Sequence, residues 1–446
     1  MSDTTIKRVA IQTRSQERNY VTKAPSSITG TSIPGLDWLT KYKDPARFSR
    51  TEEIEALFHE ISKHKDVSDI IIRPDAPICL KIKRRGLRAI THRIMDNGEC
   101  ESVIRILTLN NSIMNTIRAG ETVSGLARIL SSTDDGKAIY ADSGGRMKSR
   151  YRYEVTGCAS PKSEVSFSAI LRPLPVDPLP YDKLGMDIPF IEKCIVKDGT
   201  VIFAGATGEG KSTSLAAIIR YIAENDTMIK GNLYTHEDPI EVSYDNIRST
   251  HSLVMQSSIG QGQNIKSFDA ANRSAMRRSP DLVLVGELRD GPTVEAAVEL
   301  SLTGHPVFAT THANNISAIL PRLISRFPQE IQAQKAYDIV ETARMFVAQK
   351  LIWNTEGNIF AVRETLKFTN ELRYYLLDVL NKAGQPDAIY KKIAGIMKHG
   401  YLGSTSYERQ GKELLESGYI DEENYRYLVE GGDVLSESVL AQLNQI

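Results

Sequence analysis

The chain has 446 residues, which is enough for two or three domains. Its 55 Lys and Arg residues equal its 55 Asp and Glu residues. The resulting net charge of zero argues against a broad electrostatic grip on nucleic acid, though a local basic patch is still compatible with it. The four cysteines lie far apart without metal-ligand spacing, and no apolar run is long enough to span a membrane. We therefore expect a cytoplasmic protein with reduced thiols.

The first part of the chain predicts an arm followed by a small α+β domain. Residues 1–46 are rich in Ser, Thr, Lys and Arg, which favours an arm that is disordered or ordered only by a partner. An α+β domain is expected over residues 47–175, beginning with a helix whose Ser49 and Glu52 fit a capping box. A second helix is expected at residues 97–118, and the strands at residues 68–72, 78–83, 138–140, 150–156 and 165–171.

A proline-rich linker over residues 176–183 then leads into a segment in which strands and helices alternate. The expected strands are residues 200–204, 231–235, 282–285, 306–311 and 346–352. The expected helices are residues 211–223, 267–278, 292–302, 316–325 and 331–342. Apolar strands interleaved with helices predict an α/β domain over residues 184–370, with a mainly parallel sheet covered on both faces. Short helical patterns over residues 371–446 predict a helical tail.

A glycine-rich loop joins the first of these strands to the first helix. It has the G-x-x-x-x-G-K-[ST] spacing of a phosphate-binding P-loop. The loop consists of Gly205, Ala206, Thr207, Gly208, Glu209, Gly210, Lys211, Ser212 and Thr213. Glycines let backbone N–H groups converge on phosphate oxygens, at the positive end of the helix dipole. Lys211 can reach the β- and γ-phosphates and the Ser212 hydroxyl can ligate Mg²⁺, so we expect nucleotide binding here.

Carboxylates follow two of the expected strands. Glu287 ends the run 281–287, where it can hold Mg²⁺ through water or deprotonate an attacking water; the alternative is an exposed strand-end glutamate. Glu237 and Glu241 come directly after the strand at 231–235, where crowded carboxylates favour a nearby cation. The alternative for that segment is a polar turn initiated by Asp238-Pro239.

Two histidines flank the strand at residues 306–311. His312, at its carboxyl end, can contact the γ-phosphate, whereas His305 is expected at the opposite edge of the sheet. Seven residues of extended chain separate them by roughly 20 Å, too far to share one metal ion. A structural role for each histidine is the alternative.

Taken together, these segments resemble the secretion ATPases, and the PilT-like branch matches best. The matching segments are residues 205–213 (Walker A), 237–241 (Asp box), 284–287 (Walker B) and 303–312 (His box). In the first domain, residues 67–70, 150–153 and 170–175 resemble the family's A-S-D, R-[FY]-R and F-R-x-[IL]-P motifs. Residues 151–153, 277–278, 303–307 and 349–351 most resemble the DotB-type ATPases of Dot/Icm secretion and the TraJ-type ATPases of IncI-type conjugation.

The resemblance implies a homohexamer in which a PAS-like first domain rests on the RecA-like P-loop domain of a neighbour. ATP would bind between the two domains, so Arg150, Arg152 and Arg172 become candidates to contact its phosphates, against the alternative of ordinary strand-surface arginines. Glu287 would polarise the attacking water, Glu237 would help to position the metal ion or the water, and His312 would contact the γ-phosphate. Glu209, where the family often has Ser, brings a negative charge near the phosphates. Glu154 stands where Asn is frequent.

The function implied is an ATPase motor that powers a type IV secretion or conjugation machine at the cytoplasmic side of the inner membrane. Inner-membrane components of that machine and other transfer ATPases are the expected partners. A pilus retraction or assembly ATPase is the first alternative. A RecA-like DNA translocase ranks third, because the chain lacks a net positive charge and an aromatic-basic stacking set, and we expect no strong direct binding to nucleic acid.

Overall fold

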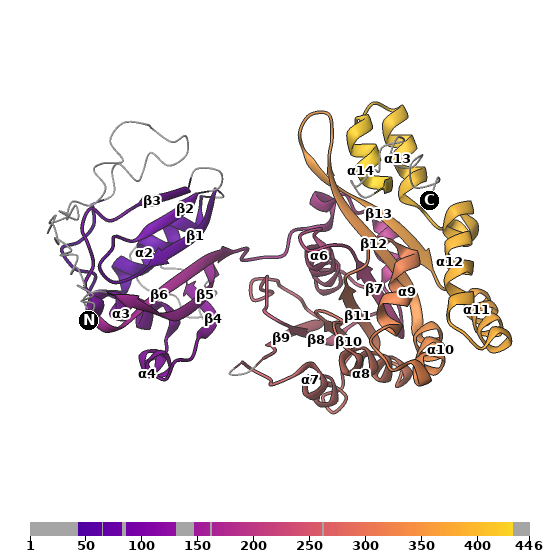
Figure 1. Cartoon of the computed structure of the whole chain (residues 1–446), viewed down its shortest axis with the longest axis horizontal. Coiled ribbons are helices and arrows are strands. Elements are labelled where there is room, and N and C mark those ends of the chain that lie inside the picture. Colours follow the sequence, from indigo (N-terminus) through magenta and orange to yellow (C-terminus); the bar gives the residue numbers. More distant parts are fainter. Residues whose placement is uncertain are drawn as a thin grey trace, which may run out of the picture. The chain divides into compact units, whose positions relative to one another are not determined.

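A computed structural model describes residues 43–64, 66–82, 86–130, 147–160, 163–260 and 263–430 of the chain. The chain divides into two compact units between Leu174 and Pro175. Figure 1 shows both units, coloured along the sequence. The strand expected at residues 138–140 and residues 1–42 of the arm expected at 1–46 lie outside the described residues.

The first unit is an antiparallel sheet packed against helices. Its six strands run in the order β3-β2-β1-β6-β5-β4. The strands are β1 (Val67–Ile72), β2 (Cys79–Ile82), β3 (Gly86–Ala89), β4 (Val123–Leu130), β5 (Met147–Ser160) and β6 (Ser163–Leu174). The helices are α2 (Thr51–Ser62), α3 (Asn97–Thr108) and α4 (Ile113–Arg118). One apolar core joins the helices to the sheet, with Phe58 of α2 edge-on to Tyr151 of β5 at 5.5 Å between ring centroids.

Two sequence expectations for this unit are wrong. The helix predicted at residues 97–118 is two helices, because Leu109 adopts a left-handed conformation (φ 53°) and the Asn110 side chain accepts the Ser112 N–H. An Asn that bonds nearby backbone competes with the helix ladder. The capping box is also absent: Arg50 is the N-cap of α2 and makes no side-chain cap bond.

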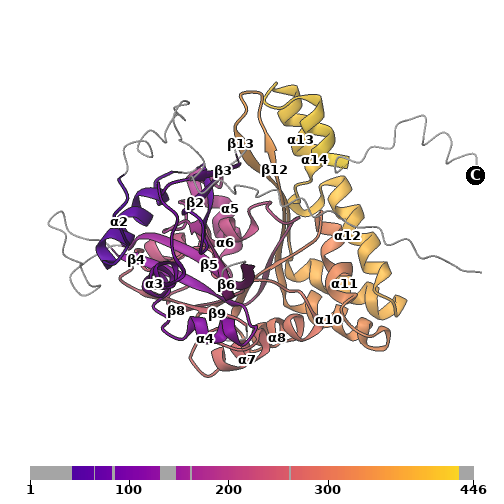
Figure 2. The same cartoon turned by 60° about the vertical axis from the view of Figure 1, so that its left-hand side comes forward.

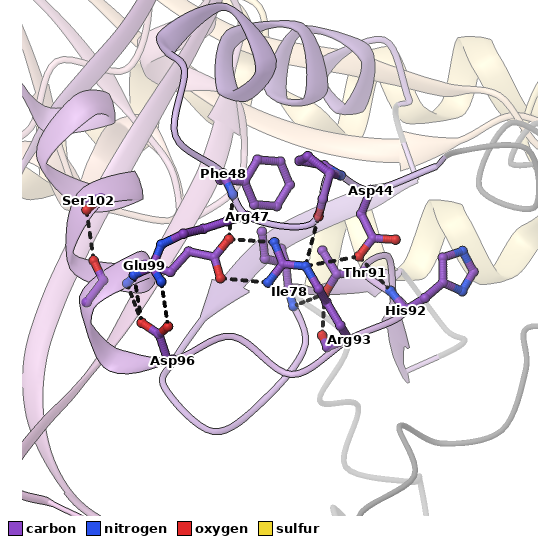
Figure 3. Close-up of polar contacts among 12 residues, drawn as sticks. Asp44, Arg47, Phe48, Ile78, Thr91, His92, Arg93, Asp96, Glu99 and Ser102 are labelled. Atoms are coloured by element: carbon purple, nitrogen blue, oxygen red, sulfur yellow. Dashed lines mark hydrogen bonds and ion pairs between the residues drawn. The ribbon is translucent and has the colours of Figure 1, made fainter.

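The residues that precede α2 are bound into the first unit by a network of charges (Figure 3). Arg93 donates from Nη1 to Glu99 Oε2 (2.6 Å) and from Nε to the carbonyl of Pro45 (2.9 Å). The buried Glu99 also accepts the backbone N–H of Phe48 at 2.6 Å. Asp44 accepts the N–H of His92 at 3.2 Å. Buried carboxylates are tolerated when they are paired and hydrogen-bonded in this way.

The second unit contains a seven-stranded sheet in the order β13-β12-β7-β11-β10-β8-β9. Every adjacent pair is parallel except β12 with β13. The strands are β7 (Gly199–Ala204), β8 (Gly231–Glu237), β9 (Ser252–Ser258), β10 (Leu282–Val285), β11 (Pro306–Thr311), β12 (Ala343–Trp353) and β13 (Ile359–Lys367). β9 and β13 had no sequence prediction. The parallel strands place their carboxyl ends along one edge of the sheet.

Helices cover both faces of this sheet (Figures 1 and 2). Along β7 the side chains alternate: Val201 and Phe203 enter one apolar core, and Ile202 and Ala204 enter the other. The period of two explains why a continuous apolar strand serves both faces. The helices are α5 (Ile188–Cys194), α6 (Lys211–Glu224), α7 (Phe268–Ala275), α8 (Gly291–Leu302), α9 (Ile316–Ile324) and α10 (Gln332–Thr342).

Four further helices complete the second unit. They are α11 (Asn370–Ala383), α12 (Asp387–His399), α13 (Tyr407–Glu416) and α14 (Glu422–Glu430). Their buried leucines and isoleucines belong to the same core as α8, α9 and α10. Both cartoon views place α13 and α14 beside β12 and β13. No helix in the described part of the chain is both long and apolar enough to cross a membrane.

Candidate nucleotide site

The glycine-rich loop follows β7 at the carboxyl edge of the parallel sheet. Gly208 (φ 89°) and Gly210 (φ 73°) adopt backbone conformations that side-chain-bearing residues rarely take. Gly210 is the N-cap of α6, and a Cβ there would lie 3.1 Å from Nε2 of Gln349. The loop therefore depends on glycine for its curvature and for its close approach to β12, and it presents the N-terminus of α6 to the cavity.

Lys211, at the first position of α6, is buried against the loop. Its Nζ donates to the carbonyls of Gly205 (2.9 Å) and Ala206 (2.8 Å). Burial lowers the pKa of Lys211, and the carboxylates of Glu287, Glu209 and Glu241 oppose this by favouring the ammonium form. A lysine held among carboxylates remains a cation that can exchange its carbonyl partners for an anionic ligand.

The strand-end carboxylates share a cavity with the loop. A cavity of about 440 Å³ is lined by Gly208, Lys211, Ser212, Glu237, Glu287 and His312 among others. Lys211 and Ser212 come from the start of α6, whereas the last three follow or end β8, β10 and β11. The order of the parallel strands brings these distant segments together, because their carboxyl ends open on one edge of the sheet.

Glu237 is fixed in this cavity by neutral donors. It is 8% exposed, and its Oε1 accepts from Thr235 Oγ1 (2.6 Å) and from Gln256 Nε2 (3.1 Å). The lack of a side chain at Gly286 lets the end of β10 lie close to β8, because a Cβ there would lie 3.0 Å from the carbonyl of His236. These two bonds orient the carboxylate at the edge of the cavity.

Glu287 and His312 face each other. Nε2 of His312 lies 3.2 Å from Oε1 of Glu287, and both side chains are partly exposed, at 37% and 41%. The exposure leaves the carboxylate accessible to water, while the contact orients the imidazole. A carboxylate that is accessible to water and lies beside an imidazole could act as a general base.

His305 lies elsewhere. It precedes β11, and its Nδ1 is 3.1 Å from Thr303 Oγ1 and 3.2 Å from the carbonyl of Leu300. These contacts lie at the C-terminal end of α8, so His305 has a structural role there. Within the described residues no group of three or more His, Cys, Asp or Glu side chains is arranged to hold a metal ion alone.

Glu209 turns to the opposite side of the loop from the cavity. Its carboxylate accepts the backbone N–H of Leu351 on β12 through Oε2, and it lines a second cavity of about 500 Å³ with Gly205 and Ala206. The three remaining members of the loop, Thr207, Gly210 and Thr213, line the first cavity. The extra negative charge is thus directed toward β12 and α14.

The three arginines belong to the first unit. Arg152 on β5 lies opposite Arg172 on β6. Arg172 pairs with Asp69, with Nη2 to Oδ1 at 2.8 Å, while its own side chain is 51% exposed. Arg150 is 1% exposed, so within this unit it is not a strand-surface arginine. Glu154, also on β5, lies opposite Ile170.

Two residues that support the site, Arg289 at the first cavity and Gln349 beneath the loop, were given no role by the sequence expectations. Arg289 lines it, forms an ion pair with Asp238 at 3.0 Å and lies over the ring of Phe268. Gln349, 1% exposed, donates from Nε2 to the carbonyl of Glu209 at 2.6 Å and accepts from Ser214 Oγ at 2.8 Å. Arg289 lies two residues after Glu287 and could have been found on that ground. Gln349 belongs to the segment 349–351 that carries part of the family resemblance, but its contacts were not predictable, because only the folding of β12 under the loop gives it these partners.

Comparison with known proteins identifies the class. Residues 180–371 match the family model for the type II/IV secretion system protein. The type IV pilus retraction ATPase PilT of Pseudomonas aeruginosa is 32% identical over 258 residues, which cover 58% of this chain and 70% of that protein. The chain belongs to this family of secretion ATPases, and it is an ATPase of the kind that serves secretion and pilus machines.

Two solved structures are similar over most of the chain. The ATPase DotB of Yersinia pseudotuberculosis is 32% identical, with a TM-score of 0.68, and the match covers 87% of this chain and 96% of that one. The ATPase DotB of Legionella pneumophila is 28% identical with a TM-score of 0.71, over 88% and 99% of the two chains. The predicted membership of the PilT-like secretion ATPases, with DotB as a near relative, is confirmed.

Proposed function

We propose that the chain is a hexameric ATPase motor of a type IV secretion or conjugation machine, acting at the cytoplasmic side of the inner membrane. The observation that carries the proposal is the gathering of Lys211, Ser212, Glu237, Glu287 and His312 around one cavity at the carboxyl edge of a parallel sheet. The likeness to DotB over nearly the whole chain supports secretion over other uses of a P-loop.

In this proposal residues 184–370 form a RecA-like domain and residues 47–175 a PAS-like one, joined by the linker at 176–183. Residues 1–46 and the helical tail at 371–446 serve as docking elements for inner-membrane components and other transfer ATPases. The hexamer matters chemically because Arg152 and Arg172 would reach ATP only where domains meet, whereas Arg150, 1% exposed, would have to leave its buried position to do so. A planar guanidinium suits charge that develops on a transferring phosphoryl group.

The residues at the cavity fit ATP with Mg²⁺. Lys211 would leave the carbonyls of Gly205 and Ala206 for the β- and γ-phosphates, and the exposed Ser212 hydroxyl and Glu237 would hold Mg²⁺, directly or through water. Side chains alone do not make a metal site among the described residues, which matches an ion shared with phosphate oxygens. Bound Mg²⁺ would neutralise phosphate charge; Glu287 would take the proton of water, and His312 would report the γ-phosphate through its contact with Glu287.

The test combines chemistry with transport. Lys211→Ala should abolish ATP turnover without unfolding the protein, whereas Lys230→Ala, which removes an exposed lysine paired with Asp226, should leave turnover intact. In the host, the wild-type gene and the Lys230→Ala form should restore plasmid transfer to a deletion strain, and Lys211→Ala should not. ATP hydrolysis by Lys211→Ala at the wild-type rate would refute the assignment of the site.

A pilus retraction ATPase is the second candidate, favoured by the identity to PilT. Loss of twitching motility with normal plasmid transfer in the deletion strain would select it over conjugation. The third candidate, a DNA translocase, predicts DNA-stimulated hydrolysis that falls steeply with salt. With a net charge of zero, we expect DNA to change the ATPase rate little at physiological salt.

A further inference from the structure

We propose that Glu209, Lys350 and Tyr427 are positioning residues that couple helix α14 to the phosphate-binding loop, so that the seating of α14 sets the affinity for nucleotide. The inference rests on the proposed nucleotide site and adds a control of that site from the C-terminal tail. It concerns the side of the loop that faces away from the phosphates, where Glu209 stands in place of the small residue frequent in the family.

Strand β12 is the junction between loop and tail. Three consecutive residues of β12 make these contacts. Gln349 donates to the carbonyl of Glu209, and the Leu351 N–H donates to the Glu209 carboxylate. Between them Lys350 extends its Nζ to the carbonyl of Leu428 in α14 at 2.7 Å. A displacement of α14 therefore acts on the strand segment that supports the loop.

The carboxylate of Glu209 also contacts α14 directly. The Tyr427 hydroxyl donates to Glu209 Oε1 at 3.4 Å, a long bond. Burial raises the pKa of Tyr427, and the adjacent Glu209 carboxylate adds to the effect. Burial lowers the pKa of Lys350, while Glu364 and Glu209 favour its charged form. A cation at the last carbonyls of a helix is favourable, so Lys350 holds the C-terminal turn of α14 by charge as well as by hydrogen bonding.

Helix α14 is attached loosely enough to move. Leu428 is its one buried residue, and the cavity of about 500 Å³ behind the loop is lined by Glu209, Lys350 and Tyr427. Elements with few buried apolar contacts are the first to open. A short helix beside open space, hydrogen-bonded to the loop through Glu209 and to β12 through Lys350, is suited to transmit a displacement of the tail to the nucleotide site.

Reciprocity supplies the test. If α14 strengthens nucleotide binding, nucleotide must stabilise α14 by the same factor. Hydrogen exchange on the full chain with and without MgADP should show protection of residues 205–213 and also of residues 422–430. Residues 370–383 of α11 should stay unchanged and serve as the internal control. In Glu209→Ser the loop should still be protected by MgADP, and α14 should not.

Two matched leucine variants test whether a change in α14 alters nucleotide binding. Leu428→Ala loosens α14, whereas Leu380→Ala removes an equally buried leucine from α11; the side chains are 0% and 4% exposed. Leu428→Ala should weaken MgADP binding by about 5-fold, the lower end of typical coupling, and Leu380→Ala should not. In the Glu209→Ser background the effect of Leu428→Ala should disappear. Tyr427→Phe deletes one hydroxyl and should also weaken MgADP binding, whereas the control Tyr419→Phe should not. This pair of variants provides the test if Leu428→Ala fails to fold.

Three results would contradict the coupling between α14 and the loop, and a fourth would also contradict the nucleotide site. Protection of the loop without protection of α14, equal effects of the two leucine variants, or an undiminished effect of Leu428→Ala in Glu209→Ser would overturn the coupling while leaving the nucleotide site standing. Absence of MgADP protection at residues 205–213 in the wild type would instead remove the proposed nucleotide site, and the coupling with it.

Discussion

Replacing Gln349 by leucine tests whether the loop depends on its buried support. The side chain is 1% exposed and its amide has three protein partners: Ser214 Oγ, the carbonyl of Glu209 and Arg363 Nε, at 2.8, 2.6 and 2.8 Å. Leucine fills a similar volume, so little cavity forms and the cost is that of the partners left behind.

The magnitude follows from what those partners retain. Arg363 keeps the carbonyls of Leu184 (2.9 Å) and Gly185 (3.3 Å), so it loses only part of its hydrogen bonding. The Glu209 carbonyl loses its amide donor. At about 1–3 kcal/mol for each unsatisfied buried group, we expect Gln349→Leu to lower the free energy of unfolding by about 2–4 kcal/mol. Because the lost donor holds the loop, ATP binding should weaken as well.

The measurements are denaturant unfolding and ATP binding of the full chain. Gln332→Leu is the control, because Gln332 is partly buried, donates to the carbonyl of Phe327 at 2.9 Å and lies outside the site. It should change the free energy of unfolding by about 1 kcal/mol and leave ATP binding unchanged. A loss below about 1 kcal/mol for Gln349→Leu, with normal ATP binding, would refute the reasoning.

Three further predictions concern catalysis, assembly and pH. Glu287→Gln should leave ATP binding intact and stop hydrolysis, since an amide cannot take a proton from water; single-turnover hydrolysis at the wild-type rate would contradict this. If the arginines complete a neighbour's site, mixing Arg172→Ala protein with Glu287→Gln protein should restore part of the turnover, and no recovery after demonstrated subunit exchange would exclude a shared site. Burial lowers the pKa of His236 from 6.5 to about 4, so the wild type should keep its full stability above pH 6.5 and lose it as pH falls toward 4. Between pH 6.5 and 4 the free energy of unfolding should fall by about 3 kcal/mol more in the wild type than in His236→Asn. Parallel pH–stability curves for the two proteins would contradict the lowered pKa of His236.

The local sequence determined where the phosphate-binding loop and its following helix lie. The glycines at 208 and 210 have no side chain, so they permit the positive φ values that the loop adopts, and Lys211 follows at a fixed spacing. The apolar strands at 200–204, 282–285 and 306–311 were also determined locally, because a strand buried on both faces is largely apolar along its whole length. The grouping of Glu237 and Glu287 was predictable because parallel strands that end at one edge bring the residues that follow them together.

Tertiary structure decided what local patterns could not express. The helix expected at 97–118 divides at Leu109, where an Asn side chain competes for the backbone. Polarity alone gives Gln349 no role, and its function arises when β12 lies beneath the loop and three buried groups need a partner. The direction of Glu209 was equally beyond the sequence. A carboxylate beside phosphates would be repelled, but the fold supplies the N–H of Leu351 and the hydroxyl of Tyr427, residues 142 and 218 positions away. Contacts over such separations depend on how the whole sheet and tail pack, which is why the sequence located the site and the folded chain determined how it is held.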